Sequence, residues 1–321
     1  MSLTSFVSLK VTRTEQLAKD ITLIALSSTN GAALPAFEAG SHLTVRTPLG
    51  ANRQYSLCSD PANTLQYEIA IKREGRGRGG SLSLVDSVRA GSELLVGPIA
   101  NNFALQNSED QALFIAGGIG ITPFISMIHQ LRASNNSNSN NFKLFYLARD
   151  HEHTAFKSFL APLVDEGSAI IHHDHGDAAK QFDLWPILET PTAAHIYCCG
   201  PKSLMDSVKD MVGHWPQKQI HFENFNADIA LHDTDSAFVV AINSSSCEFQ
   251  VEAGESILNT LRANGIDVAS SCESGTCGSC RVGLIEGIAD HRDLVLFDDE
   301  KDSHIMVCVS RAKTARLVLD L

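Results

Sequence analysis

Residues 271–281 read S-C-E-S-G-T-C-G-S-C-R, and a more distant cysteine, Cys308, follows in M-V-C-V-S. Cys272, Cys277 and Cys280 have the spacing C-x4-C-x2-C, which together with a distant fourth cysteine is the plant-type [2Fe–2S] ligand pattern. Three thiolates from one loop require a tight wrap, and the small residues between the cysteines permit it. Their backbone N–H groups can approach the sulfur atoms and tune the reduction potential. The pattern therefore predicts a low-potential, one-electron carrier.

A structural zinc site or a set of disulfides is the alternative for these cysteines. Zinc sites usually contain paired C-x2-C knuckles, and only Cys277 and Cys280 form one here. The remaining cysteines are scattered along the chain, and in a reducing compartment we expect them to be buried or inert thiols. The iron–sulfur interpretation is favoured.

Composition places the chain among ordinary globular proteins. Its 321 residues are 44% hydrophobic, which is enough for two or three domains. No stretch reaches the length of a membrane span, and the N-terminus lacks the pattern of a signal peptide, so we expect a cytoplasmic protein.

The net charge is −12, and residues 237–321 carry thirteen acidic and seven basic residues, which is half of the excess negative charge. This charge argues against nucleic acid or an anionic membrane as partner and favours a basic protein surface, although simple solubility explains it equally well.

The first segment, residues 1–104, reads as a succession of strands with glycine and proline between them. Alternating and β-branched residues predict a small antiparallel β-barrel. The expected strands are Phe6–Val11, Ile21–Leu26, His42–Arg46, Gln54–Cys58, Tyr67–Lys72 and Glu93–Val96.

The second segment, residues 105–226, alternates strands with helices and predicts a parallel sheet with crossover helices. The expected strands are Ala112–Ala116, Lys143–Leu147, Ala169–Ile171 and His195–Cys198, and a helix is expected from Pro123. Residues 227–236 are polar and aspartate-rich and read as a linker. Residues 237–321 form a third, α+β unit, with a hairpin of Phe238–Ile242 and Glu248–Val251, a helix at Ile257–Ala263 and a closing strand at Leu317–Leu319.

Two stretches of the first segment suit a ring that carries a phosphate. In R-Q-Y-S-L, residues 53–57, alternation places Arg53 beside Tyr55 on one face of a strand. About twenty residues later, Lys72 precedes R-G-R-G-G-S, residues 76–81, which opens a probable helix over 82–88. Glycines at a helix start expose backbone N–H groups where the helix dipole favours an anion. The basic glycine-rich loop is weak evidence alone and stronger beside R-Q-Y-S-L.

The second segment contains two glycine turns of the kind that hold a dinucleotide. A-G-G-I-G-I-T-P, residues 116–123, follows an apolar strand and opens a helix, where Thr122 can act as the N-cap. C-C-G-P, residues 198–201, also follows a strand. Turns at the carboxyl ends of strands frame the crevice where dinucleotides bind. Simple helix initiation is the alternative for Gly200 and Pro201.

Two charged runs could be interpreted as functional sites, but we favour a structural role for each. Four adjacent residues, H-H-D-H at 172–175, cannot all point at one ion, so we expect a strand end and a loop. D-H-R-D, residues 290–293, could face an electron acceptor, but salt bridges within its own domain are the simpler expectation.

In their order along the chain, these motifs resemble the phthalate dioxygenase reductase family, the FMN-containing reductases of Rieske-type aromatic-ring oxygenases. The motifs are R-Q-Y-S-L, R-G-G-S, G-G-I-G-I-T-P, Y-C-C-G-P, C-E-S-G-T-C-G-S-C, D-H-R-D and C-V-S-R-A-K. The resemblance covers essentially the whole chain and implies an FMN barrel, an NAD domain and a C-terminal plant-type ferredoxin domain. Related reductases that use FAD place the ferredoxin domain at the N-terminus.

The resemblance also implies roles for particular residues. FMN would be held by Arg53, Tyr55, Ser56, Leu57, Lys72, Gly79, Gly80 and Ser81, with Thr122 and Phe225 near the ring. The nicotinamide dinucleotide would be held by Gly117, Gly118, Gly120, Asp150, Cys199, Gly200 and Pro201. The cluster ligands would be Cys272, Cys277, Cys280 and Cys308. Asp150, near the end of the second strand of the nucleotide domain, can bond a ribose 2′-hydroxyl and repel a 2′-phosphate, whereas the adjacent Arg149 could accept one, so the preference for NADH rests on the resemblance.

The implied activity is transfer of electrons from NADH through FMN and the [2Fe–2S] cluster to a separate oxygenase, by a reductase that is monomeric. The cofactors supply the chemistry, so no general acid or base is required. Two alternatives remain: an NADH-dependent reductase for a diiron oxygenase or a separate ferredoxin, and a non-enzymatic redox sensor. The sensor leaves two nucleotide-type sites unexplained.

Overall fold

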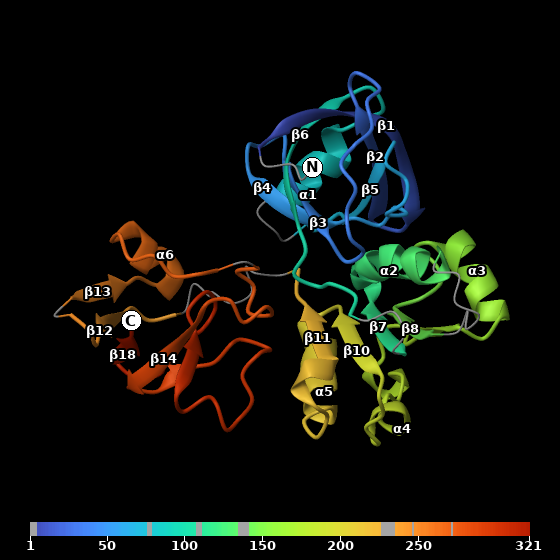
Figure 1. The fold of residues 1–321 in the computed structure, drawn as a ribbon. Helices are drawn as coiled ribbons and strands as arrows, with labels where there is room; N and C mark the ends of the chain where they lie inside the picture. The colour runs from blue at the N-terminus through green and yellow to red at the C-terminus, as the bar shows by residue number, and fades with distance from the viewer. Residues whose placement is uncertain are drawn as a thin grey trace. The chain divides into compact units, whose positions relative to one another are not determined.

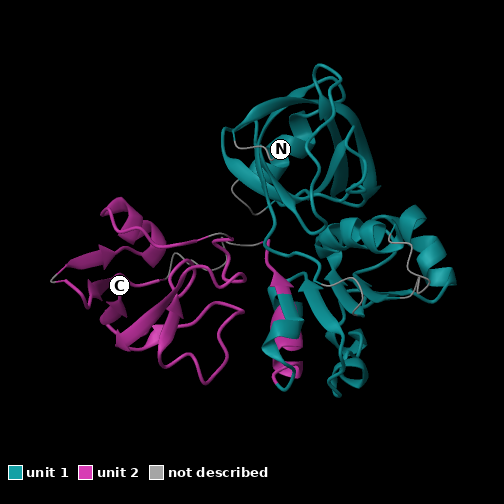
Figure 2. Ribbon diagram, in the orientation of Figure 1, with its two compact units in different colours: residues 1–204, 214–221 teal, residues 205–213, 222–321 magenta. Residues whose placement is uncertain are grey.

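A computed structural model describes residues 5–75, 79–106, 111–133, 141–225, 235–245, 247–270 and 272–321. The chain forms two compact units (Figure 2): Met1–Leu204 with His214–His221, and Met205–Gly213 with Phe222–Leu321. The division falls inside one helix and one strand. Most of the predicted linker, residues 227–234, lies outside the described residues. The asparagine- and serine-rich run over 135–141, which the sequence predicts to be a solvated loop, also lies outside them except for residue 141. Among the described residues, no helix has both the length and the apolar character that crossing a membrane requires.

The first sheet is a six-stranded antiparallel barrel with the strand order β4-β3-β6-β1-β2-β5 (Figure 1). An antiparallel bridge between Leu57 and Ile69 joins the two ends of this order, and so closes the barrel. Alternating apolar residues of these strands fill the interior. The elements are β1 (Val7–Ala18), β2 (Ile21–Ser28), β3 (His42–Arg46), β4 (Asn52–Ser56), β5 (Tyr67–Lys72), α1 (Gly80–Ser87) and β6 (Glu93–Ala100).

The second sheet has five strands in the order β11-β10-β7-β8-β9, and the pairs of β10 with β7, β7 with β8 and β8 with β9 are parallel. The predicted parallel sheet is therefore confirmed. Its strands are β7 (Ala112–Gly117), β8 (Phe142–Ala148), β9 (Ala169–His173), β10 (His195–Cys199) and β11 (Ile220–Glu223). Its helical segments are η1 (Gly118–Ile121), α2 (Thr122–Ala133), α3 (Lys157–Asp165), η2 (Ala178–Lys180), α4 (Trp185–Leu188), α5 (Lys202–Met211) and η3 (Gln217–Gln219).

Within the first unit, the barrel and the parallel sheet share one hydrophobic core. The backbone N–H of Gly40, in a barrel loop, donates to Oγ of Ser126 on α2 at 3.2 Å. Gly40 has a φ of +86°, and a Cβ there would lie 2.1 Å from the carbonyl oxygen of Phe103. Only glycine permits this approach, so the loop fixes the barrel against α2.

The second unit contains a mixed five-stranded sheet in the order β13-β12-β18-β14-β16, in which β12 and β18 are parallel. A small sheet of β15 and β17 accompanies it. Helix α6 is N-capped by Ser256, whose Oγ accepts the N–H of Asn259. The elements are β12 (Phe238–Ile242), β13 (Glu248–Val251), α6 (Ile257–Ala263), β14 (Arg281–Glu286), β15 (Ala289–Asp290), β16 (His304–Met306), β17 (Arg311–Ala312) and β18 (Arg316–Asp320). The predicted hairpin and helix are confirmed.

Several predicted boundaries were wrong. β1 runs seven residues beyond Val11, because pairing with β2 continues across two irregularities to Ala18. β4 ends at Ser56, since Leu57 makes the closing bridge instead of continuing the strand. The predicted helix over 82–88 begins earlier, at Gly80.

Candidate functional site

The two predicted FMN motifs lie together in the barrel. A Cβ added to Gly80 would lie 3.2 Å from Nε and 3.3 Å from Cγ of Arg53, so the Arg53 side chain covers the first residue of α1. Gly79, at the N-cap of α1, has a φ of +80° and no side chain that could cap the helix. The first amides of α1 and a guanidinium therefore meet at one place, as a phosphate site requires. Arg76, Gly77 and Arg78 lie outside the described residues.

Thr47, at the end of β3, belongs to this place and was missed by the sequence interpretation. Its methyl group would lie 3.5 Å from a Cβ at Gly80. Its Oγ1 is buried and, among the described residues, has no hydrogen-bond partner. A buried hydroxyl without a partner is unusual and fits a ligand oxygen. No local signal in V-R-T-P-L identifies Thr47, since the contact depends on the turn that returns β4 along β3.

Tyr55 lies two residues from Arg53 on β4 and is partly buried. Burial raises the pKa of Tyr55 to about 12, against the opposing charge of Arg53. The phenol therefore stays neutral and can donate a hydrogen bond. Ser56 and Leu57, which follow it, are buried.

The other predicted FMN residues differ in their surroundings. Lys72 ends β5 with 52% of its side chain exposed, 3.7 Å from Glu74. Oγ of Ser81 accepts the N–H of Glu74, so it ties the connection from β5 to α1. Thr122 is not the N-cap that we predicted: it lies inside α2, and its Oγ1 donates to the carbonyl of Ile119 because η1 continues into the helix. Phe225 belongs to the second unit and is 40% exposed, and its role stays a prediction.

The two predicted glycine turns pack backbone against backbone. A Cβ at Gly120 would lie 2.2 Å from the carbonyl oxygen of Cys199, and one at Gly200 would lie 2.9 Å from Cα of Gly117. A Cβ at Gly117 would meet Cδ of Pro201 at 2.6 Å. These glycines are needed because β7 and β10 are neighbours, with Ala116 beside Cys199.

Gly118 differs from these glycines. It has a φ of +55°, and an added Cβ would meet nothing within 4 Å. Its backbone therefore faces open space at the carboxyl end of β7, where a dinucleotide is expected. Gly118 is the glycine of this pair of turns that is best placed for a ligand.

Asp150 follows β8 and is already engaged. Its Oδ1 accepts the backbone N–H of His153 at 3.0 Å and lies 2.7 Å from the ring Nδ1 of His153. The hydrogen bond from the His153 ring lowers the pKa of Asp150 to about 2. The N–H of Lys19, in the barrel, donates to the carbonyl of Glu152 and fixes this loop within the first unit. Asp150 is thus an ionised, oriented carboxylate with 30% of its side chain exposed.

His153 and its neighbours were missed as partners of Asp150. Oγ1 of Thr154 donates to the carbonyl of Asp150 and lies 2.9 Å from Nε2 of His173. The H-H-D-H run therefore ends β9 beside this loop, as expected for a strand end. The i, i+3 spacing of Asp150 and His153 is the signal that could have shown the contact.

The four predicted cluster cysteines form two pairs. The N–H of Cys272 donates to Sγ of Cys277 at 3.4 Å. Cys280 and Cys308 form the second pair, since each is the largest cause of the shift in the other's pKa, which is lowered for Cys280 and raised for Cys308. No group of three or more metal-binding side chains occurs in the described part of the chain. Two thiolates for each of two irons match the ligand set of a [2Fe–2S] cluster.

Donors surround the sulfur of Cys272. The N–H groups of Ser274 and Thr276 approach it at 3.4 and 3.5 Å. Hydrogen bonds from Cys277, Ser274 and Thr276 lower the pKa of the Cys272 thiol despite its burial. The loop therefore favours a thiolate and offers the N–H groups that the spacing predicted.

Comparison with known proteins agrees with this geometry. Residues 240–313 match the family model of the 2Fe-2S iron-sulfur cluster binding domain, and residues 114–210 match that of the oxidoreductase NAD-binding domain. Phthalate dioxygenase reductase of Burkholderia cepacia is 48% identical over 98% of this chain and 98% of its own. The phthalate 4,5-dioxygenase oxygenase reductase subunit of Pseudomonas putida is 47% identical over 98% of this chain and 97% of its own.

A solved structure of phthalate dioxygenase reductase, described as a modular structure for electron transfer from pyridine nucleotides to [2Fe-2S], is also similar. It superposes with a TM-score of 0.69 over 98% of both chains at 48% identity. The predicted multidomain fold, the oxidoreductase class and the set of FMN, NADH and a [2Fe–2S] cluster are confirmed. With near-complete coverage at this identity, the chain belongs to the phthalate dioxygenase reductase family of oxygenase reductases.

Proposed function

We propose that this protein is the reductase component of a two-component Rieske-type aromatic-ring oxygenase, and that it works as a monomer in the cytoplasm. One observation carries the proposal: a single chain contains both the two cysteine pairs and the phosphate-sized site of Arg53, Thr47 and Gly80. Such a chain combines a site for a two-electron carrier with a site for a one-electron carrier. The sequence contains no C-x-H and C-x2-H Rieske motif, so the oxygen chemistry belongs to a partner.

The residues of the first unit fit FMN. Arg53, the amides after Gly79 and the hydroxyl of Thr47 would bind its phosphate, and the neutral phenol of Tyr55 would donate to the ring system. The open backbone at Gly118 would bind the dinucleotide, and Asp150 would accept a hydrogen bond from its adenosine ribose. Bound FMN and the cluster would together supply the conversion of a hydride donor into single electrons.

We place the functional domains at residues 1–104 for FMN, 105–226 for NADH and 237–321 for the cluster, joined by a linker at 227–236. The separate sheets of the structure support these limits. Two further features support a monomer in a reducing compartment. The exposed large apolar residues of the described part are distributed over several loops and elements, and three of the four cysteines outside the cluster pattern, Cys58, Cys198 and Cys199, are buried.

The decisive experiment is reconstitution. The purified protein, loaded with flavin and cluster, should support NADH-driven oxidation of an aromatic substrate by a Rieske-type oxygenase, and omission of either protein should abolish product. Turnover with a diiron oxygenase or a separate ferredoxin, and none with Rieske-type oxygenases, would assign the alternative acceptor. Failure to reduce ferricyanide with NADH would contradict any reductase.

A further inference from the structure

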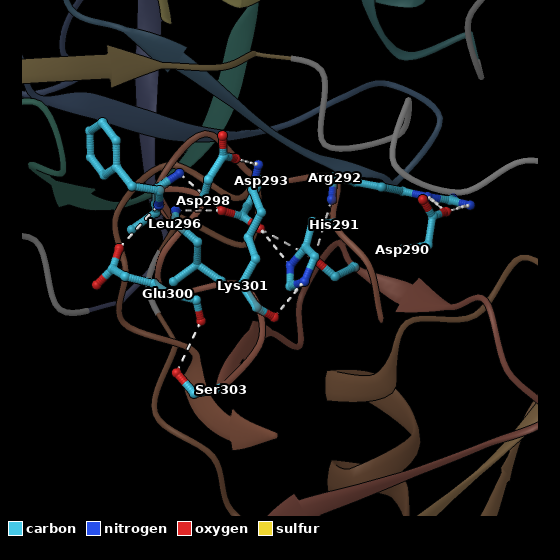
Figure 3. A network of polar contacts seen from close by, with 12 residues as sticks. Asp290, His291, Arg292, Asp293, Leu296, Asp298, Glu300, Lys301 and Ser303 are labelled. Carbon is cyan, nitrogen blue, oxygen red and sulfur yellow. Dashed lines mark hydrogen bonds and ion pairs between the residues drawn. The ribbon is translucent and has the colours of Figure 1, made fainter. Parts of the chain in front are cut away.

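The D-H-R-D segment, residues 290–293, makes a polar network inside the second unit (Figure 3). The Asp293 side chain is fully shielded from solvent. Its Oδ2 accepts the backbone N–H groups of Val295 at 3.0 Å and Leu296 at 2.7 Å. Burial raises the pKa of Asp293, but the His291 ring, 3.7 Å away, and the hydrogen bonds from the N–H groups of Leu296 and Val295 outweigh it and leave that pKa below its ordinary value. Asp293 is thus an ionised carboxylate that shapes its own loop.

This loop touches the loop that carries three of the cysteines. The N–H of Leu294 donates to the carbonyl of Gly275 at 2.9 Å. Gly275 has a φ of +75°, and a Cβ there would lie 3.2 Å from Cα of Asp293 and 2.7 Å from Cγ2 of Val309. Val309 follows Cys308, and Oγ of Ser310 donates to Oδ1 of Asp293 at 3.4 Å, so the Asp293 loop contacts both cysteine-bearing stretches.

Gly275 lies between two of the donors to sulfur. The N–H groups of Ser274 and Thr276, on either side of it, both point at Sγ of Cys272. The Thr276 N–H is in the same peptide group as the Gly275 carbonyl, and the Ser274 N–H is in the peptide group two positions earlier. A contact that holds the Gly275 carbonyl therefore fixes the direction of the Thr276 N–H directly and restrains that of the Ser274 N–H through the intervening peptide. Hydrogen bonds to sulfur stabilise the extra electron of a reduced cluster and raise its potential.

A partly buried ion pair also holds the segment. Arg292 donates to both carboxylate oxygens of Asp235, at 2.9 and 2.7 Å, and pairs with Asp290 at 2.6 Å. The bond to Asp235 is the main cause of the raised pKa of Arg292. The N–H of Arg292 also donates to Oγ of Ser310. Such a pair is geometrically demanding, and removing one partner leaves a buried charge.

We propose that Asp293 is a positioning residue for the [2Fe–2S] cluster, held by the Asp235–Arg292 pair, and that it sets the cluster potential through Gly275 and the two N–H donors. It ligates no iron. Asp235 directly follows residues 226–234 and belongs to the end of the proposed linker, so the support for the cysteine loop begins two residues before the third domain. The proposal uses the cluster assigned by the family match and is independent of the oxygenase partner.

Two variants of equal charge test the proposal. Asp293→Asn loses the charge but keeps an oxygen that can accept the N–H groups of Val295 and Leu296. Asp293→Ala loses both. Asp298→Asn is the matched control for charge, because Asp298 lies five residues after Asp293 and has 96% of its side chain exposed. For each holoprotein, the cluster potential is measured by dithionite titration with mediators, the EPR g-values are recorded in the reduced state, and cluster loss is followed in a chelator.

We expect Asp293→Ala to have a lower potential than Asp293→Asn, altered g-values and a loss of cluster about 10- to 100-fold faster than wild type. Asp293→Asn and Asp298→Asn should keep the wild-type g-values. Equal potentials and spectra for the alanine and asparagine variants would overturn the proposal, whatever their thermal stability.

A second variant covers the case in which Asp293→Ala does not load a cluster. Arg292→Lys keeps the charge but cannot donate to both oxygens of Asp235. Arg292→Lys should lower the cluster potential and shift the g-values in the same direction as Asp293→Ala. A wild-type potential and spectrum in Arg292→Lys would show that the Asp235–Arg292 pair does not position the loop.

Discussion

The Arg53 side chain lies against Gly80, with Nε 3.2 Å from where a Cβ of Gly80 would stand. Residues from a strand and from a helix start, 27 positions apart, thus lie together where we propose an anion site. Arg53→Ala should weaken FMN binding about 10- to 100-fold, since a hydrogen bond to a charged group contributes about 1.5–3 kcal/mol. Flavin fluorescence titration measures the dissociation constant, and mass spectrometry of the released flavin should find FMN. Arg13→Ala, which removes an exposed arginine from the same barrel, should bind FMN normally. Recovery of FAD, or equal affinities for both variants, would contradict the assignment.

Coenzyme choice should depend on Asp150 and on the His153 side chain that orients it. We expect Asp150→Asn to lower kcat/KM for NADH and to narrow its advantage over NADPH, and His153→Ala to act in the same direction. The loss should be about 10- to 100-fold for Asp150→Asn, because a charged hydrogen bond disappears. Glu152→Gln is the control, since it removes an adjacent exposed charge. Titration with ADP-ribose and its 2′-phosphate gives the affinities without flavin chemistry, and an unchanged preference in Asp150→Asn would show that Asp150 only orders its loop.

Cys277→Ser should abolish the cluster and destabilise the second unit, whose fold is built around the cysteine loop. The reduction of ferricyanide with NADH should survive, because hydride transfer needs only the sites of the first unit, while turnover with an oxygenase should stop. A chain that ends near Asn226 should likewise reduce ferricyanide with NADH and fail to support an oxygenase. Iron and sulfide analysis and the two assays measure these effects. Cys247→Ser, which changes an exposed cysteine of the same unit, should retain the cluster. Oxygenase turnover by a variant that lacks the cluster would show that the cluster is not on the electron path.

The first unit should lose stability in mild acid through His221. Burial, with the charge of His195 beside it, lowers the pKa of His221 to about 4, against about 6.5 for an unfolded histidine. Between these values the unfolded chain binds a proton that the folded chain does not. The free energy of unfolding should therefore fall as pH decreases from 6.5 to 4, by at most about 1.4 kcal/mol per pH unit.

His221→Phe is the test of that slope. The phenyl ring can keep the stacking on Tyr197, whose ring centroid lies 4.5 Å from that of His221, but it cannot titrate. Its denaturation midpoints should fall less steeply with acid than those of wild type, while His151→Gln, at an exposed position, should keep the wild-type slope. Identical slopes for His221→Phe and wild type would exclude His221 as the source.

Local patterns were sufficient for most elements. The hairpin of β12 and β13 and helix α6 have the predicted limits, because alternation and an N-cap define them within a few residues. The full length of β1 was not predictable, since its outer residues are polar and only the pairing with β2 keeps them extended. The same reason explains the limit of β4, where the bridge of Leu57 to Ile69 depends on closure of the barrel.

The site residues likewise divide into those that local sequence predicts and those that it does not. The cysteine loop and the glycine turns follow from spacing along the chain. Thr47 and the support of Gly275 by the Asp293 loop do not, because they join residues separated by more than fifteen positions. The capping role predicted for Thr122 failed, since η1 extends the helical path before α2 and supplies the carbonyl of Ile119.

The contacts of Gly117, Gly120 and Gly200 affect how mutations in the nucleotide site can be interpreted. A methyl group at any of them would lie within 3 Å of protein atoms, so an inactive alanine variant reports a disturbed junction of β7 and β10 and says little about NADH. Gly118 offers the more informative experiment, because a side chain there would meet open space and only the φ of +55° would resist it, which asparagine tolerates better than alanine. A mutational scan that measures activity alone would identify all four glycines as coenzyme contacts. A scan that also measures folding would separate them and leave Gly118 as the candidate contact with the coenzyme.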